Sequence, residues 1–163
     1  MPKILVTLAV NDNNYTKAIC PRTTLLNFLR EEIGLTGSKK GCDAGECGCC
    51  SVLIDGKPIL SCITLAAEMQ GRKITTIEGI GTKESPHPLQ TAMVEEGAIQ
   101  CGFCTPAMVI NGVNLLENTK KLKKEVKRKE IKECISGTIC RCTGYTKIEK
   151  AFETAAEKME NAR

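Results

Sequence analysis

Two groups of four cysteines constrain this chain more than any other feature of its sequence. The first group has the order Cys-x4-Cys-x2-Cys with a fourth cysteine downstream, and its members are Cys42, Cys47, Cys50 and Cys62. This is the spacing that holds a plant-type 2Fe-2S cluster. The second group joins a Cys-x2-Cys pair to a distant Cys-x-Cys pair, and its members are Cys101, Cys104, Cys140 and Cys142. Two complete sets of thiols predict two redox centres, and this favours electron transfer.

Eleven cysteines among 163 residues could instead form the disulfide framework of a small secreted domain. The odd count argues against such a framework, and the first residues open directly into a strand-like pattern without a signal peptide. No apolar run is long enough to span a bilayer. We therefore expect a cytoplasmic protein with reduced thiols, in which bound clusters stabilise two small domains.

The net charge of +4 is too small to indicate nucleic-acid binding, but basic residues are concentrated in residues 120–132. Glutamates interrupt this stretch and its apolar stripe is thin, so we expect a solvated loop and helix face. Docking to an acidic partner surface is the alternative. The stretch has no aromatic platform for single-stranded nucleic acid, and we expect no nucleic-acid partner.

The first half of the chain reads as a small sheet crossed by one helix. Alternating or branched segments predict strands over residues 4–10, 15–19, 51–54, 59–62 and 73–77. Turn residues separate the first two strands at 11–14, and Asp55-Gly56 separates the next two. Thr23 and Thr24 are N-cap candidates for a helix that ends at Gly34. Residues 41–50 form a loop whose glycines let backbone N–H groups approach a cluster.

The second half reads as helices, predicted at residues 87–98, 106–117, 125–136 and 144–159. A glycine- and proline-rich stretch precedes them, which predicts a first domain over residues 1–78, a linker over 79–86 and a helical domain over 87–163. His87, between two prolines, is expected to be a linker or helix-start residue. Each cysteine pair of this half precedes a helix for which Thr105 or Thr143 is the expected N-cap, a position that tolerates an anionic cluster.

Three segments closely resemble the iron-sulfur subunit of the molybdenum hydroxylases, the family of xanthine dehydrogenase, carbon monoxide dehydrogenase and nicotinate dehydrogenase. Residues 34–62 read GLTGSKKGCDAGECGCCSVLIDGKPILSC, residues 99–108 read IQCGFCTPAM and residues 140–145 read CRCTGY. The match covers nearly the whole chain in the right order. The resemblance implies an α+β chain with an N-terminal β-grasp, plant-type ferredoxin domain and a C-terminal four-helix-bundle 2Fe-2S domain.

The resemblance also implies ligands and partners. The first cysteine group matches the ligands of an outer cluster and the second group those of an inner cluster. Gln100 matches a residue that contacts a molybdopterin cofactor on a large subunit. This cofactor is expected to be of the cytosine dinucleotide type. Cys142 matches the ligand that bridges the inner cluster toward the molybdopterin. Electrons are expected to pass singly to FAD on a medium subunit or to another acceptor, within a heterotrimer or its dimer.

Three positions depart from the family pattern, namely Cys49, Ala107 and Thr138. None of the three is an expected ligand, since the spacing of the first group is complete without Cys49. A free-standing two-cluster, ferredoxin-like carrier and a zinc-stapled binding module remain as alternatives. A single histidine excludes a Rieske centre, and the chain has no glycine-rich motif for a nucleotide.

Overall fold

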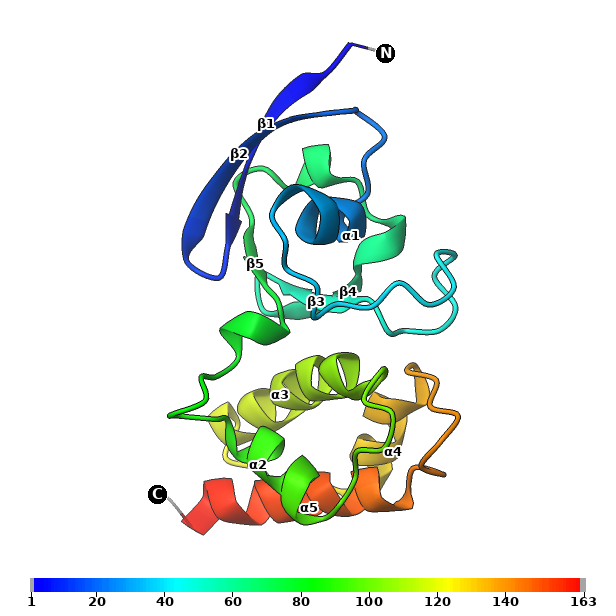
Figure 1. Cartoon of the computed structure of the whole chain (residues 1–163). Coiled ribbons are helices and arrows are strands. Elements are labelled where there is room, and N and C mark those ends of the chain that lie inside the picture. The colour runs from blue at the N-terminus through cyan, green and yellow to red at the C-terminus, as the bar shows by residue number, and fades with distance from the viewer. Residues whose placement is uncertain (1, 162–163) are drawn as a thin grey trace.

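The computed structural model describes residues 2–161, and its first elements are the strands of a β-hairpin (Figure 1). Strand β1 (Ile4–Val10) pairs antiparallel with β2 (Asn13–Ile19). The turn between them is shorter than the predicted 11–14 turn, because β2 already begins at Asn13. Asn11 and Asp12 have φ values of 48° and 63°, the left-handed pair that a two-residue hairpin turn needs.

The helix after the hairpin is shorter and wider than predicted. It consists of one α-helical turn, α1 (Leu25–Asn27), and a π-helical turn, η1 (Phe28–Glu32). Thr24 is its N-cap, since its hydroxyl accepts a hydrogen bond from the Asn27 N–H at 3.2 Å. Arg30 donates to the Thr36 and Ser38 carbonyls, both at 2.9 Å, and so holds the loop that leads to the first cysteine group.

The sheet contains five strands in the order β2-β1-β5-β3-β4. Strands β3 (Ser51–Ile54) and β4 (Lys57–Leu60) form a second hairpin, and β5 (Lys73–Thr75) runs parallel to β1 and antiparallel to β3. The predicted strands 59–62 and 73–77 both end early, because short 3-10 turns follow at η2 (Ser61–Ile63) and η4 (Ile77–Gly79). A further such turn, η3 (Ala66–Met69), packs beside β1. The sheet is therefore mixed, and with the helices below it the chain is α+β.

The second half consists of helices that lie under the sheet in Figure 1. Their bounds are α2 (Pro88–Glu95), α3 (Thr105–Lys121), α4 (Arg128–Ser136) and α5 (Thr146–Asn161). His87 is the N-cap of α2, because its Nδ1 accepts from the Leu89 N–H at 3.1 Å, and the expectation of a helix-start residue is confirmed. Helix α3 packs against both the second hairpin and the other helices, so it joins the two halves.

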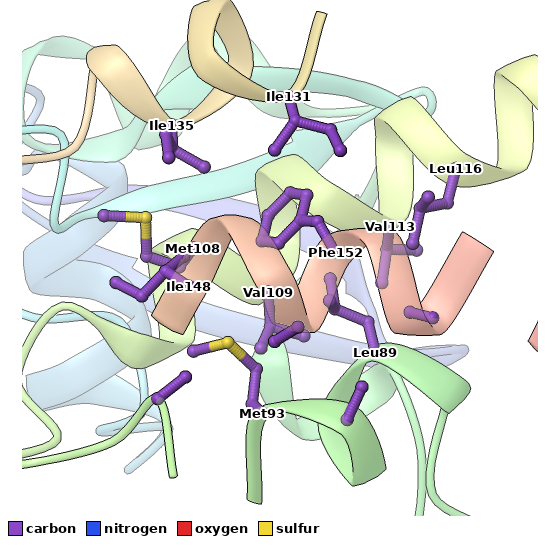
Figure 2. Packing of buried hydrophobic residues seen from close by; sticks show 14 of the residues in the cluster. Leu89, Met93, Met108, Val109, Val113, Leu116, Ile131, Ile135, Ile148 and Phe152 are labelled. Atoms are coloured by element: carbon purple, nitrogen blue, oxygen red, sulfur yellow. The ribbon is translucent and has the colours of Figure 1, made fainter. Parts of the chain in front are cut away.

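Each half has its own hydrophobic core. Figure 2 shows the hydrophobic core of the helical half, where Phe152 of α5 and Met108 of α3 pack with side chains of α2 and α4. The sheet core is separate and contains Val6, Leu8, Phe28 and Ile74, all fully buried. Burying a side chain of this size contributes about 1.5–3 kcal/mol. Of the two cysteine groups, Cys104 lies in the helical core, whereas Cys50 and Cys62 pack with Leu26 in a small third cluster.

The basic stretch is exposed except at Val126 and Ile131. Several of its charges pair within the chain, as Arg128 does with Glu149 at 3.2 Å. Across residues 2–161, the structure contains no helix that is both long and apolar enough to cross a membrane.

Candidate iron-sulfur sites

Cys42 lies in the exposed loop of the first group, where the backbone wraps around its sulfur. Its Sγ accepts hydrogen bonds from the N–H groups of Ala44, Glu46 and Cys47, at 3.3, 3.2 and 3.4 Å. Asp43 and Gly45 have φ values of 58° and 79°, which turn these N–H groups inward. The three donors, led by that of Cys47, lower the pKa of the Cys42 thiol to about 6. The loop is therefore built to hold a thiolate.

The other sulfurs of the first group come from less exposed positions. Cys47 is half-buried, and Cys50 and Cys62 are buried at the open end of the second hairpin. The Cys50 carbonyl accepts from the Ser61 hydroxyl at 2.6 Å, which fixes the residue preceding Cys62. Burial, followed by the neighbouring Cys50 sulfur, raises the pKa of Cys62 to about 11. The group thus extends from solvent at Cys42 into the protein.

The second group is assembled from two turns that flank helices. Cys104 is the residue immediately before α3, at the positive end of a 17-residue helix. Burial raises the pKa of its thiol to about 12. Cys101 and Cys142 are exposed, and their sulfurs lie 3.5 Å apart. The structure therefore brings together cysteines that are separated by 41 positions in the sequence.

Cys140 is held by groups that the sequence did not reveal. The Tyr145 hydroxyl accepts from the Cys140 N–H at 2.8 Å and donates to the Thr138 carbonyl at 3.2 Å. The Cys140 sulfur lies 3.1 Å from the Thr143 hydroxyl. Burial opposes ionisation of Cys140, but the hydrogen bonds from Thr143 and nearby backbone groups bring its pKa below the ordinary value.

The expected threonine N-caps are wrong. Cys104, and not Thr105, occupies the N-cap of α3, and no side chain caps that helix end. Thr143 lies three residues before α5, and its hydroxyl accepts from the Tyr145 N–H at 3.2 Å. The Thr143 hydroxyl therefore stabilises the turn that carries Cys140 and Cys142. Helix-start preferences in the sequence do not reveal this role.

A cavity of about 230 Å³ lies at the second cysteine group and reaches the first group at Cys47. It is lined by every member of the second group together with Cys47, Cys49, Gly41, Phe103, Ile139 and Arg141. Within residues 2–161, no three cysteine, histidine or acidic side chains converge closely enough to bind a single metal ion. A 2Fe-2S cluster distributes four thiolates over two iron atoms, so its ligands do not meet at one point. Four thiolates suit either the two iron atoms of such a cluster or one tetrahedral zinc ion, and among residues 2–161 the lack of a single point of convergence favours the cluster.

The two cysteine loops touch at the junction of the halves, where they lie side by side in Figure 1. The Ile139 N–H, next to Cys140, donates to the Cys47 carbonyl at 2.9 Å. Gly48 has a φ of +71°, and a Cβ added there would lie 2.0 Å from the Gly137 carbonyl oxygen. Only glycine permits this approach, so the sequence at Gly48 sets how closely the loops pack.

Gln100 lies in the exposed turn between α2 and α3, directly before Cys101. Several apolar side chains near the exposed cysteines face solvent, namely Ile99, Phe103 and Ile139, which are 38%, 44% and 56% exposed. Ala107 is fully buried in α3, and the Thr138 hydroxyl accepts from the Asn111 amide at 3.1 Å. These three side chains add exposed apolar surface next to the cysteines of the second group.

Two family models match the chain. A 2Fe-2S iron-sulfur cluster binding domain matches residues 9–74, and a [2Fe-2S] binding domain matches residues 76–153. Among curated proteins, the nicotinate dehydrogenase small FeS subunit of Eubacterium barkeri is 40% identical, over 99% of this chain and 100% of its own length. The aldehyde oxidoreductase iron-sulfur-binding subunit of Escherichia coli K12 is also 40% identical, over 98% of this chain and 75% of its own length.

Solved structures agree with these matches. Quinoline 2-oxidoreductase from Pseudomonas putida 86 contains a chain that is 37% identical, with a TM-score of 0.90 over 99% of this chain and 98% of that one. The aldehyde oxidoreductase of Desulfovibrio desulfuricans is 34% identical with the same TM-score, but the match covers 98% of this chain and 17% of that chain. The fold therefore occurs both as a separate chain and as a segment of a longer one.

Proposed function

The chain belongs to the family of the iron-sulfur subunits of the molybdenum hydroxylases, and from this membership we propose how its two cysteine groups serve electron transfer. It is the electron-transfer subunit of a multisubunit oxidoreductase, and the substrate chemistry takes place on another subunit. The observation that carries this function is the match to a small FeS subunit over the full length of that subunit. A free-standing carrier is not favoured.

We propose that the first cysteine group holds the outer 2Fe-2S cluster and the second group holds the inner one. The support for the outer site is the set of backbone N–H groups around Cys42. The support for the inner site is the cavity that its four cysteines share and the position of Cys104 at the start of α3. When bound, a 2Fe-2S cluster accepts and releases one electron at a time, at a potential set by hydrogen bonds and burial.

Residues of this chain fix the positions and the charge of the cysteine sulfurs at both sites. The N–H groups at Cys42 stabilise negative charge on sulfur, as second-sphere donors do in metal sites generally. Cys62 and Cys104 are buried, so each group has at least one sulfur position that is shielded from solvent. Tyr145 and Ile139 fix the turn that carries Cys140, so the separation of the two groups is set by rigid backbone contacts.

The second group also marks the side on which a larger partner subunit is expected to dock. Gln100 and Cys142 are exposed there beside the apolar side chains Ile99 and Phe103. We propose that these two residues approach a molybdopterin cofactor of the cytosine dinucleotide type on the large subunit. The exposed Cys42 loop is proposed to face the acceptor, FAD on a medium subunit, in a heterotrimer or its dimer.

Three finer features belong to the same proposal. The division into residues 1–78, a linker at 79–86 and residues 87–163 is supported by the separate cores of the two halves. A β-grasp sheet and a four-helix bundle are supported by the strand order and by the core that α2 to α5 share. A cytoplasmic location is supported by the eleven cysteines, all within residues 2–161 and none in a disulfide there.

The proposal is tested by purifying the tagged chain with whatever subunits accompany it. We expect a coloured complex that contains molybdenum, together with iron and acid-labile sulfide for two 2Fe-2S clusters in each copy of this chain. Purification of the chain alone with both clusters would support a free-standing carrier instead. Stoichiometric zinc in place of iron would refute the proposal.

A further inference from the structure

Cys49 is a cysteine of the first loop that neither group requires. It is 3% exposed and lies at the junction of the two halves. Its neighbour Cys50 packs with Cys62 and Leu26, in a small cluster on the sheet side. Cys49 packs instead in the core of the helices, the same core that contains Cys104. Adjacent cysteines of one loop therefore point into different halves of the protein.

The cavity beside Cys49 confirms this difference. Cys49 lines it together with all members of the second group, whereas of the first group Cys47 alone among the described residues contributes to its wall. The backbone of Cys49 thus belongs to the first loop, while its side chain belongs to the second site. Sequence proximity to Cys47 and Cys50 suggests the opposite assignment.

The direction of the Cys49 thiol follows from its hydrogen bonds. The S–H group donates to the Cys47 carbonyl at 3.6 Å and to the Ile139 carbonyl at 3.9 Å. A thiol is a weak donor whose sulfur retains its lone pairs. Because the hydrogen points to these backbone oxygens, the negative end of the S–H dipole faces the cavity.

We propose that Cys49 is a positioning residue of the second site, whose thiol lowers the redox potential of the cluster held by the second group without binding iron. Reduction adds negative charge, and the negative end of a nearby dipole makes that addition less favourable. The same thiol contacts the carbonyl next to Cys140, and so it also steadies that ligand turn. This role rests on the proposed function, because it needs a cluster at each site.

The test is a redox titration of the purified complex, followed by electron paramagnetic resonance, for Cys49→Ala and Cys49→Ser. The two reduced-cluster signals are assigned beforehand with Cys62→Ala and Cys104→Ala, each of which should remove one of them. We expect both Cys49 variants to retain full iron content. Cys49→Ala should raise the midpoint potential of the second-group signal and leave the other unchanged. Cys49→Ser, which keeps an electronegative atom there, should have a lower potential than Cys49→Ala.

Cys134→Ala is the matched control. Cys134 also lies outside both groups, but it lines a groove between α3 and α4 to whose described wall no cysteine of either group contributes. It should shift neither potential. A shift confined to the first-group signal, no shift in either signal, or iron loss in Cys49→Ala would each overturn the role of Cys49. Absence of two cluster signals in the unmodified protein would refute the proposed function itself.

Discussion

Replacing Gly48 with alanine should weaken the protein more than replacing a glycine of the same backbone conformation elsewhere. Gly48 and Gly71 have φ values of +71° and +77°. A left-handed conformation costs a non-glycine residue roughly 1–2 kcal/mol, and this cost is common to both variants. Around Gly71 there is open space within 4 Å of the added Cβ, whereas at Gly48 the Cβ would meet the Gly137 carbonyl oxygen at 2.0 Å.

The additional cost at Gly48 comes from separating the two loops. The turn from Gly137 to Ile139 has to move, which breaks the hydrogen bond from the Ile139 N–H to the Cys47 carbonyl. One such bond contributes about 0.5–1.5 kcal/mol. The free energy of unfolding should therefore fall by roughly 1.5–3.5 kcal/mol for Gly48→Ala, against about 1–2 kcal/mol for Gly71→Ala.

The measurement is urea unfolding of both variants in the same cluster-loaded state, followed by circular dichroism. Hydrogen exchange of the Ile139 amide provides an independent readout, and it should accelerate in Gly48→Ala alone. Equal losses of stability in the two variants, with unchanged exchange at Ile139, would show that the close approach at Gly48 does not hold the loops together.

Three further predictions concern single side chains. In protein from which the clusters have been removed, Cys42 should react with iodoacetamide first at pH 7, because its pKa is about 6, and Cys104 should react slowly; mass spectrometry that finds Cys104 labelled as fast would contradict this. Burial lowers the pKa of His87, so the stability that its neutral form provides is present above the unfolded pKa of about 6.5 and is lost as the pH falls below it. Urea midpoints measured across this pH range should therefore fall less with decreasing pH in His87→Asn than in the unmodified protein. Arg30→Ala should loosen the loop before Cys42 at a cost of about 1.5–3 kcal/mol for its charged hydrogen bonds, and protease cleavage in residues 36–42 no faster than in the unmodified protein would refute that role.

Much of the sheet could be predicted because its signals are local. Branched residues gave the strands near their observed positions, and Asp55-Gly56 forms the predicted turn between β3 and β4. Asn11 and Asp12 adopt left-handed conformations, which shortened the first turn to two residues. The π-helical turn of η1 has no signature in apolar periodicity, because the same buried side chains suit an α-helix.

The contacts that shape the sites could not be predicted, because they join residues far apart in the sequence. Nothing in the spacing of Cys47 reveals its bond to Ile139, or that the Tyr145 hydroxyl connects Cys140 with Thr138. The grouping of the eight cysteines could be predicted from spacing and family resemblance, and their roles as ligands stay a prediction. The orientation of Cys49 depends on which core its side chain enters, which is a property of tertiary packing.

The most direct measurement of the central claim is electron paramagnetic resonance of the reduced, purified complex, with iron quantified in two ligand variants. The unmodified chain should give two distinguishable 2Fe-2S signals. Cys50→Ala should lose one signal and half of the iron, and Cys104→Ala should lose the other signal and half of the iron. A single signal in the unmodified protein, or loss of the same signal in both variants, would contradict the assignment of one cluster to each cysteine group.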